Sequence, residues 1–431
     1  MNTVLFVTHK PKRCGVYDFG KNVFDCIKAS QKFDFVKAEC SSLNELFAAI
    51  ETNKPEIIIY NYHPSVLPWI TDKVFKGINR NNVSHVKAIQ IGIIHEVTQE
   101  LADNATSYHN KFIPGPFNRK LNSLFDFYIA ADPTLLLKNP FVFKTGRLIQ
   151  TYHTETTDPA ITTIGSFGFG TPNKGFEDLV ARVQEEFDEA IINFNIPTAD
   201  FDDPQGENAR KIAAECRSLI RKPGIQLNIN HDFLSQSELL NFLSGNSMNC
   251  FFYKDKNGRG ISSAVDYALA ANKPLAITNC PMFRHVLAYA PEVSIEKNSL
   301  RNILSKGIAP IEPCIKEWQP ANLVWDYERI IDAAILKTKF PRIEKMGIKR
   351  TVKAKIAKLI TFPSPSFTWL RNTANVTDDS LDLDTNIQYE PIPESSVKYN
   401  RILNDEARGL YKNAIGTLNK LLPVTMAKKI A

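Results

Sequence analysis

The 431-residue sequence lacks the patterns that would place it in several specialised classes of protein. It has no apolar run approaching the roughly 20 residues that a membrane-spanning helix needs. Its seven cysteines are odd in number, scattered and never arranged as CxxC, which argues against a disulfide framework or a zinc site. Its histidines show no HExxH or other metal-binding spacing. We therefore expect buried thiols in a reducing compartment and no metal centre.

What the sequence does contain is typical of a globular protein. Hydrophobic residues make up 43% and charged residues 23%, and the length suffices for two or three domains. In the opening MNTVLFVTHKPKR, the apolar run precedes the basic residues, which is the reverse of a secretory signal. These features predict a cytoplasmic protein that begins with a β-strand.

The net charge of +6 is modest, and much of it lies in one basic stretch, Pro341–Ile360. A nucleic-acid-binding protein spreads basic charge over a face and interleaves aromatic residues, and neither pattern occurs here. We therefore expect no nucleic-acid partner. Val352, Ile356 and Leu359 share one side of the basic stretch, so weak contact with an anionic membrane surface is the alternative to a solvated helix.

Short apolar runs alternate with amphipathic stretches through the first two thirds of the chain. This order predicts βαβ units and parallel sheets. It pauses near residues 147–159 and then resumes, which indicates two consecutive α/β domains, at 1–155 and 156–340. The expected strands are Val4–His9, Glu56–Tyr62, Ala88–Glu96 and Phe125–Asp132, followed by Thr162–Gly168, Glu189–Ile196, Gly224–Phe233, Met248–Lys254 and Lys273–Asn279.

Helical spacing of apolar residues marks the segments between these strands and one segment after them. Ser235 followed by Glu238 is the sequence of a capping box. Residues 341–398 combine the basic stretch with a Pro/Ser/Asp-rich linker, and residues 399–431 contain a last amphipathic helix. The expected helices of the two domains are Lys21–Ser30, Phe176–Phe187, Asn208–Arg221, Ser235–Leu243 and Val324–Leu336.

The stretch IGSFGFGTPNKGF at Ile164–Phe176 predicts a strand, a glycine-rich turn and a helix start. Glycines allow a ligand to approach the backbone closely, and Lys174 at the helix start would meet anionic oxygens. The P-loop spacing GxxxxGK and the dinucleotide fingerprint GxGxxG are both absent. The alternative is an exposed turn with an incidental lysine.

A second loop, NGRGISS, precedes a helix in the same predicted domain. Open α/β sheets bind ligands in loops at the carboxyl ends of their strands. Arg259 offers a guanidinium fork for phosphate, Gly260 allows close approach, and Ser262 and Ser263 add hydroxyls beside the unsatisfied amides of a helix start. Asp266, one turn later, would accept a hydrogen bond from a ribose. The alternative is an ordinary helix cap with a surface arginine.

The turn at Lys174, the segment HDFLSQSELLNFLSGN at 231–246 and the segment SSAVDYALAANKPLAIT at 262–278 together resemble the C-terminal domain of retaining GT-B glycosyltransferases of the group 1 or family 4 type. The resemblance implies two Rossmann-like domains facing a cleft, with the donor held by the second domain and the acceptor by the first. It also implies that Lys174 pairs with the donor diphosphate, with Arg259 and Gly260–Ser263 beside it.

The sequence departs from that family at its acidic positions. Gly258 and Arg259 stand where the family has its first glutamate, and the second glutamate, which holds the nucleotide ribose, falls near Asp266. Arg259 then replaces an acid with a positive charge. A non-catalytic protein that binds nucleotide sugars with the same fold is therefore an alternative.

Two segments of the first domain extend the resemblance. In RCGVYDFGKN at Arg13–Asn22, Gly15 would let the loop approach the reaction centre and Arg13 would meet phosphate; the alternative is a plain βα turn. In IGIIHEVTQE, His95 would contact the transferred sugar, and otherwise it ends the strand.

The resulting hypothesis is a glycosyltransferase that moves a hexosyl or pentosyl unit from a nucleotide-diphosphate sugar to a glycan, lipid-linked or protein acceptor. It would need neither a cofactor nor a metal, since charge at the leaving diphosphate comes from side chains. A peripheral membrane scaffold built on residues 341–431 is the third alternative.

Overall fold

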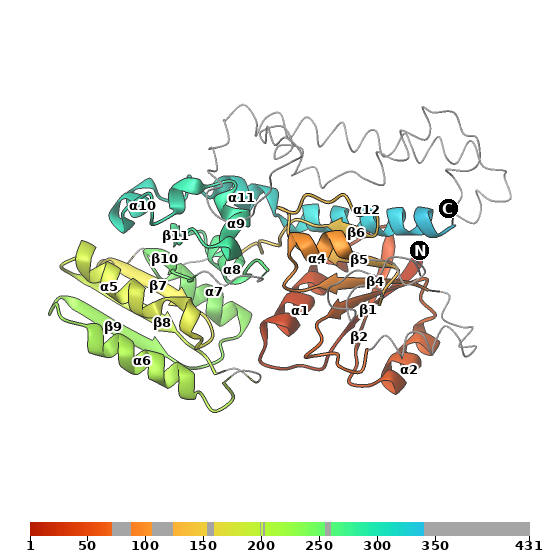
Figure 1. The fold of residues 1–431 in the computed structure, drawn as a ribbon, viewed down its shortest axis with the longest axis horizontal. Helices are drawn as coiled ribbons and strands as arrows, with labels where there is room; N and C mark the ends of the chain where they lie inside the picture. Colours follow the sequence, from red (N-terminus) through yellow and green to blue (C-terminus); the bar gives the residue numbers. More distant parts are fainter. Residues whose placement is uncertain are drawn as a thin grey trace.

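The structure is a computed structural model that describes residues 1–70, 88–105, 124–152, 159–198, 200, 203–254 and 260–339. These residues form two parallel α/β domains that lie side by side (Figure 1). Arg259, the basic stretch, the linker and the predicted last helix lie outside the described residues.

The first domain is built on a six-stranded parallel sheet in the order β2-β1-β3-β4-β5-β6. Every residue of β3 and β4 is buried. Such continuous burial is expected for parallel strands that are covered by helices on both faces. The strands are β1 Asn2–Thr8, β2 Phe33–Glu39, β3 Ile57–Tyr62, β4 Ile89–Ile94, β5 Phe127–Ala130 and β6 Val142–Lys144.

Helices cover both faces of this sheet. One face of β1, with Val4 and Phe6, packs in a cluster with side chains of α1 (Gly15–Ile27) and α12 (Pro320–Lys339). The other face packs against α2 (Leu43–Asn53), and α4 (Gln99–Asn104) follows β4. Because α12 follows all the strands of the second sheet, the chain must return to the first domain to place it there. In the sequence, these residues fell within the predicted second domain.

The second domain is built on a five-stranded parallel sheet in the order β11-β10-β7-β8-β9. The α5 and α6 helices pack in one cluster with β7 and β8, and α7 packs against α8 and β7. The capping box at Ser235 and Glu238 is confirmed at the start of α7. The strands are β7 Thr163–Phe167, β8 Ala190–Asn195, β9 Ile225–Asn230, β10 Met248–Phe251 and β11 Leu275–Ile277.

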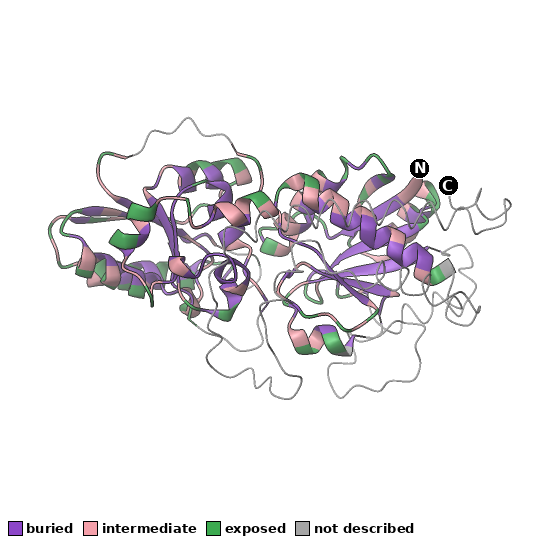
Figure 2. Ribbon diagram, turned by 90° about the horizontal axis from the view of Figure 1, so that it is seen from above, coloured by how far each residue is buried: buried purple, intermediate pink, exposed green. Residues whose placement is uncertain are grey.

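The helices of the second domain become shorter toward its end. The longer ones are α5 Phe176–Glu186, α6 Glu207–Leu219 and α7 Gln236–Ser244. The shorter ones are α8 Ala264–Ala270, α9 Arg284–Leu287, α10 Leu300–Lys306 and α11 Glu312–Glu317, with single 3₁₀ turns η1 Pro172–Lys174, η2 Pro281–Phe283 and η3 Pro291–Val293. In both domains the buried strands lie at the centre, with exposed residues on the outer faces of the helices (Figure 2).

Each strand expected from the sequence is present, and two further strands were not foreseen. β2 alternates buried and exposed residues at the edge of its sheet and carries charged side chains. β6 is only three residues long. α1 also starts earlier than expected, because the Cys14 side chain accepts a hydrogen bond from the Tyr17 amide and caps the helix.

Candidate active site

The carboxyl ends of the two sheets face each other. Arg13, which follows β1, contacts Asp200, which follows β8. Gly260, which follows β10, packs on Glu96, which follows β4, so tightly that a Cβ on the glycine would lie 2.5 Å from the Glu96 Cα. We call the residues that follow β1, β3 and β4 the first sheet edge. The second sheet edge consists of the residues that follow β7 and β10, together with the loop into α8. Ligands of open parallel sheets bind at such edges.

Three histidines lie on the first sheet edge, because β1, β3 and β4 are adjacent and each ends one residue before a histidine. His95 Nε2 lies 2.7 Å from Asn61 Oδ1, and its ring is 6.5 Å from that of His63. Burial, together with the nearby His63 and Arg147, lowers the pKa of His95 to about 3. His95 is therefore an uncharged hydrogen-bonding group at neutral pH.

His9 is the third of these histidines and is also uncharged. Burial and, to a smaller extent, Lys12 lower its pKa to about 4, against the opposing effect of Glu39. Its Nε2 lies 3.3 Å from the Cys14 sulfur. Burial raises the pKa of the Cys14 thiol, so this cysteine stays protonated and serves as a helix cap.

The start of α1 carries the two donor-binding candidates of the first domain. A Cβ on Gly15 would meet no described atom within 4 Å, so the glycine leaves open space here. Arg13 is engaged by the second domain: its Nε and Nη2 each lie 2.8 Å from Asp200 Oδ1, and its Nη1 lies 3.1 Å from Thr198 Oγ1. A phosphate contact by Arg13 would compete with Asp200.

Asp18, in the first turn of α1, is a carboxyl group that the sequence reasoning did not single out. Burial raises its pKa to about 6, and nearby Lys21 partly opposes the shift. One turn later, Asn22 donates a 2.8 Å hydrogen bond to the Tyr267 hydroxyl of α8. This face of α1 therefore packs against the second domain.

Lys174 lies on the second sheet edge, at the end of the turn that follows β7. Gly175 has φ +67°, and a Cβ there would lie 1.9 Å from the Phe252 carbonyl oxygen, so glycine is required for this turn to pack. The Lys174 ammonium lies 3.7 Å from the centroid of the Tyr253 ring. It forms no ion pair with any carboxylate of the described residues.

The loop into α8 is held by contacts within the protein. The Ser262 amide donates to the Met282 carbonyl at 2.9 Å, and the Ser262 hydroxyl accepts from the Ala264 amide at 3.3 Å. The Ser263 hydroxyl accepts from Arg147 at 2.9 Å. A ligand role for these two serines therefore stays a prediction, and would require donors other than the Ser262 amide.

Asp266 is engaged by Arg147, which precedes β7 and is 4% exposed. Arg147 donates to Asp266 Oδ2 from Nε at 3.0 Å and from Nη2 at 2.5 Å. The other oxygen of Asp266 lies 3.6 Å from His285 Nε2, and burial lowers the pKa of that histidine. The predicted ribose contact of Asp266 would have to coexist with this buried ion pair.

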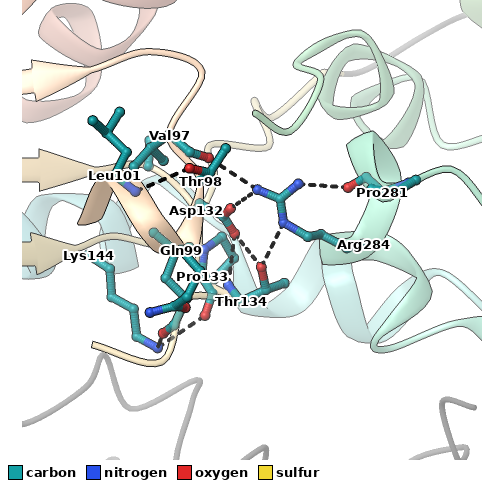
Figure 3. A network of polar contacts seen from close by, with 12 residues as sticks. Val97, Thr98, Gln99, Leu101, Asp132, Pro133, Thr134, Lys144, Pro281 and Arg284 are labelled. Carbon is teal, nitrogen blue, oxygen red and sulfur yellow. Dashed lines mark hydrogen bonds and ion pairs between the residues drawn. The ribbon is translucent and has the colours of Figure 1, made fainter. Parts of the chain in front are cut away.

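A second arginine joins the two domains. Arg284, at the start of α9, reaches across to the end of β5, where its Nη2 pairs with the fully buried carboxylate of Asp132 and its Nε donates to Thr134 Oγ1 at 3.1 Å (Figure 3). Asp132 also accepts from the Thr134 amide at 2.9 Å. This network joins the second domain to the end of β5 in the first.

The structure thus distributes the predicted site residues over both sheet edges. Arg13, Gly15 and His95 lie on the first sheet edge, and Lys174, Gly260, Ser262, Ser263 and Asp266 lie on or behind the second. Arg259 lies outside the described residues.

Sequence reasoning missed Arg147 and Tyr253. Tyr253 follows a buried strand, as His63 and His95 do, so the same strand-end argument could have found it. Arg147 lies in a segment without periodicity and had no comparable signal.

Among the described residues, no three His, Cys, Asp or Glu side chains gather to form a set of metal ligands. Nor does any helix among them have the length and apolar character to cross a bilayer.

The fold is similar to that of two solved structures. HepE of Anabaena, in complex with UDP and glucose, superposes with a TM-score of 0.50 and 8% identity over 77% of this chain and 100% of that one. Sucrose-phosphate synthase of Thermosynechococcus elongatus gives a TM-score of 0.50 and 8% identity over 77% of this chain and 98% of that one. No family model and no curated protein matches the sequence. The predicted GT-B architecture of two Rossmann-like domains is thereby confirmed.

Proposed function

We propose that this protein transfers a sugar from a nucleotide-diphosphate donor to an acceptor hydroxyl, with retention of anomeric configuration and without a metal ion. The observation that carries the proposal is Lys174, an ammonium without a carboxylate partner among the described residues, at a glycine-containing turn on the second sheet edge. The fold supports it, because HepE has a similar fold and was solved with UDP and glucose.

The proposed reaction breaks the bond between the anomeric carbon and the diphosphate oxygen, and the electron pair leaves with the diphosphate. A cation fixed beside that oxygen stabilises the transition state, because the negative charge grows as the bond breaks. We assign this role to Lys174, with Arg259 and Gly260 as further contacts. The acceptor oxygen bonds to the anomeric carbon, and its proton passes to the leaving diphosphate.

We place the transferred sugar against the first sheet edge. A sugar is uncharged and is bound by neutral donors and acceptors, and His95 is such a group because its pKa is about 3. Asn61 holds His95 Nε2 at 2.7 Å, so Nδ1 is the nitrogen that would face a sugar hydroxyl. Gly15 leaves open space on the same edge.

The test is a panel of nucleotide sugars incubated with the purified protein, with released nucleotide measured and UDP and GDP binding measured by calorimetry. We expect micromolar to millimolar binding of one nucleotide and slow release from its sugar, because hydrolysis is the usual side reaction without an acceptor. If the protein neither binds a nucleotide nor releases one from any sugar of the panel, the proposal is wrong.

A protein that binds nucleotide sugars without turnover is the second candidate. It is favoured by the Asp266–Arg147 ion pair, which occupies a carboxylate expected to hold the ribose, and by Gly258 and Arg259 at an expected acidic position. The same panel separates the two: binding without release in the presence of candidate acceptors supports this candidate. The membrane-scaffold alternative concerns residues outside those that the structure describes, and liposome sedimentation at low salt tests it directly.

A further inference from the structure

The Tyr253 hydroxyl is buried and has no hydrogen-bond partner among the described residues. The side chain is only 3% exposed, and its ring packs at 4.7 Å from the Phe283 ring and 6.2 Å from the Phe251 ring. Phenylalanine would provide the same packing. A buried hydroxyl without a partner costs free energy, because it has lost its hydrogen bonds to water. Its presence therefore calls for an explanation.

The hydroxyl points toward the turn that carries Lys174. A Cβ placed on Gly168 would lie 3.6 Å from the Tyr253 oxygen and 3.6 Å from Cδ and Cε of Lys174. The Lys174 ammonium lies over the face of the same ring, 3.7 Å from its centroid. One hydroxyl, one ammonium and a glycine backbone therefore meet at the end of β7.

We propose that the Tyr253 hydroxyl donates a hydrogen bond to the same diphosphate oxygen that Lys174 neutralises. This inference rests on the proposed function, and it adds a residue whose partner would be an anionic oxygen. Hydrogen bonds from a hydroxyl to an ionised oxygen are short and about twice as strong as those between neutral groups. Gly168 brings only backbone to this spot, because it has no side chain.

The Tyr253 ring has a separate positioning role. The negative face of an aromatic ring attracts an ammonium, so the ring holds the Lys174 head group at the turn. Tyr253→Phe keeps this platform and removes only the hydroxyl. Tyr253→Leu removes both, and we expect a larger loss of UDP affinity from it than from Tyr253→Phe.

The control is Tyr327→Phe. The Tyr327 hydroxyl is also buried without a partner among the described residues, but it lies on α12, in the cluster that packs against the first sheet. Removing either hydroxyl should leave the thermal midpoint unchanged or raise it, because no described hydrogen bond is lost. Only Tyr253→Phe should weaken UDP binding, by roughly tenfold to a hundredfold, the range for a hydrogen bond to a charged group.

A double-mutant cycle with Lys174→Ala, measured by calorimetry with UDP, tests the shared oxygen. We expect Tyr253→Phe to cost less in the Lys174→Ala protein than in the parent, because groups that contact one atom are coupled. Equal UDP affinity of the parent and Tyr253→Phe, with affinity lost in Lys174→Ala, would overturn the Tyr253 assignment alone. Additive losses would assign the two groups to separate oxygens and overturn the shared contact. A parent protein that binds no nucleoside diphosphate would overturn both this inference and the proposed function.

Discussion

The two sheet edges carry opposite kinds of chemistry although both are carboxyl ends of parallel sheets. The first sheet edge presents His9 and His95, whose imidazoles are uncharged because burial lowers their pKa values, and its cation Arg13 is paired with Asp200. The second sheet edge presents Lys174, whose described contact is the face of Tyr253. The first sheet edge therefore offers uncharged imidazoles, and the second offers an ammonium.

Under the proposed function, this difference separates two tasks. A leaving diphosphate needs fixed positive charge, whereas a sugar needs neutral hydrogen-bonding groups that do not compete for the diphosphate. The domains are joined by two arginine–aspartate pairs whose carboxylates are buried, Arg147–Asp266 and Arg284–Asp132. Substitutions that change one edge, or one of these pairs, at a time test this difference.

Removing the Lys174 cation should have the largest effect. Under the proposed function, Lys174→Ala lowers turnover by roughly tenfold to a thousandfold, the range for losing one contact to developing charge. Steady-state kinetics with the preferred donor checks this. Lys306→Ala, an exposed lysine of α10 in the same domain, is the matched control and should leave turnover unchanged. Arg259→Ala tests the second predicted cation, and unchanged rates in both Lys174→Ala and Arg259→Ala would refute the charge assignment.

Breaking a buried pair between the domains should come next. Arg284→Met leaves the fully buried Asp132 carboxylate without its cation, and we expect the free energy of unfolding to fall by about 3 kcal/mol. Urea titration measures it. Lys316→Ala, which removes an exposed pair with Glu312, should change stability by less than about 0.5 kcal/mol. If Arg284→Met proves as stable as Lys316→Ala, the contacts in Figure 3 do not contribute to the free energy of unfolding.

The neutral imidazole of His95 should make stability depend on pH. Its pKa is about 3 in the folded protein and 6.5 in an unconstrained chain, so between these values only the unfolded chain binds the proton. The contribution of His95 to the free energy of unfolding is therefore complete above pH 6.5. It decreases as the pH falls, by about 1–2 kcal/mol at pH 5. Urea unfolding of the parent and of His95→Gln at pH 7 and pH 5 isolates this contribution. Identical pH dependence in both proteins would show that His95 titrates normally.

The exposed pair between Arg13 and Asp200 should have the smallest effect. Asp200→Ala is expected to change the free energy of unfolding by no more than about 1 kcal/mol, because exposed ion pairs contribute little. It also releases Arg13, so UDP affinity should rise if that guanidinium contacts phosphate. Affinity that falls or stays constant would indicate that Arg13 joins the domains and does not bind the donor.

Most strands could be predicted because a parallel strand covered on both faces is a short apolar run. β2 escaped prediction since an edge strand tolerates charged residues on its exposed side, and β6 because three residues are too few to show a period. The amphipathic pattern of α12 predicted a helix but could not say which sheet it would cover. Periodicity reports that a face is buried and says nothing about its partner.

In the candidate site too, local patterns could be predicted and contacts between distant residues could not. Lys174 could be found because a lysine beside glycines at a helix start is a local pattern. The partners of Arg13 and Asp266 could not be found, because Asp200 and Arg147 are distant in sequence and meet them only in the folded chain. Whether these charges are free for a ligand is decided by those contacts.

Local sequence patterns were enough to predict the βαβ order, the presence of two α/β domains and the turn that carries Lys174, since all three depend on neighbouring residues. The folded chain was needed to show that His9 and His95 are uncharged, that Asp266 faces Arg147, and that the Tyr253 hydroxyl is buried beside Lys174. The physical reason is that burial and charge pairing depend on groups brought together from distant parts of the chain.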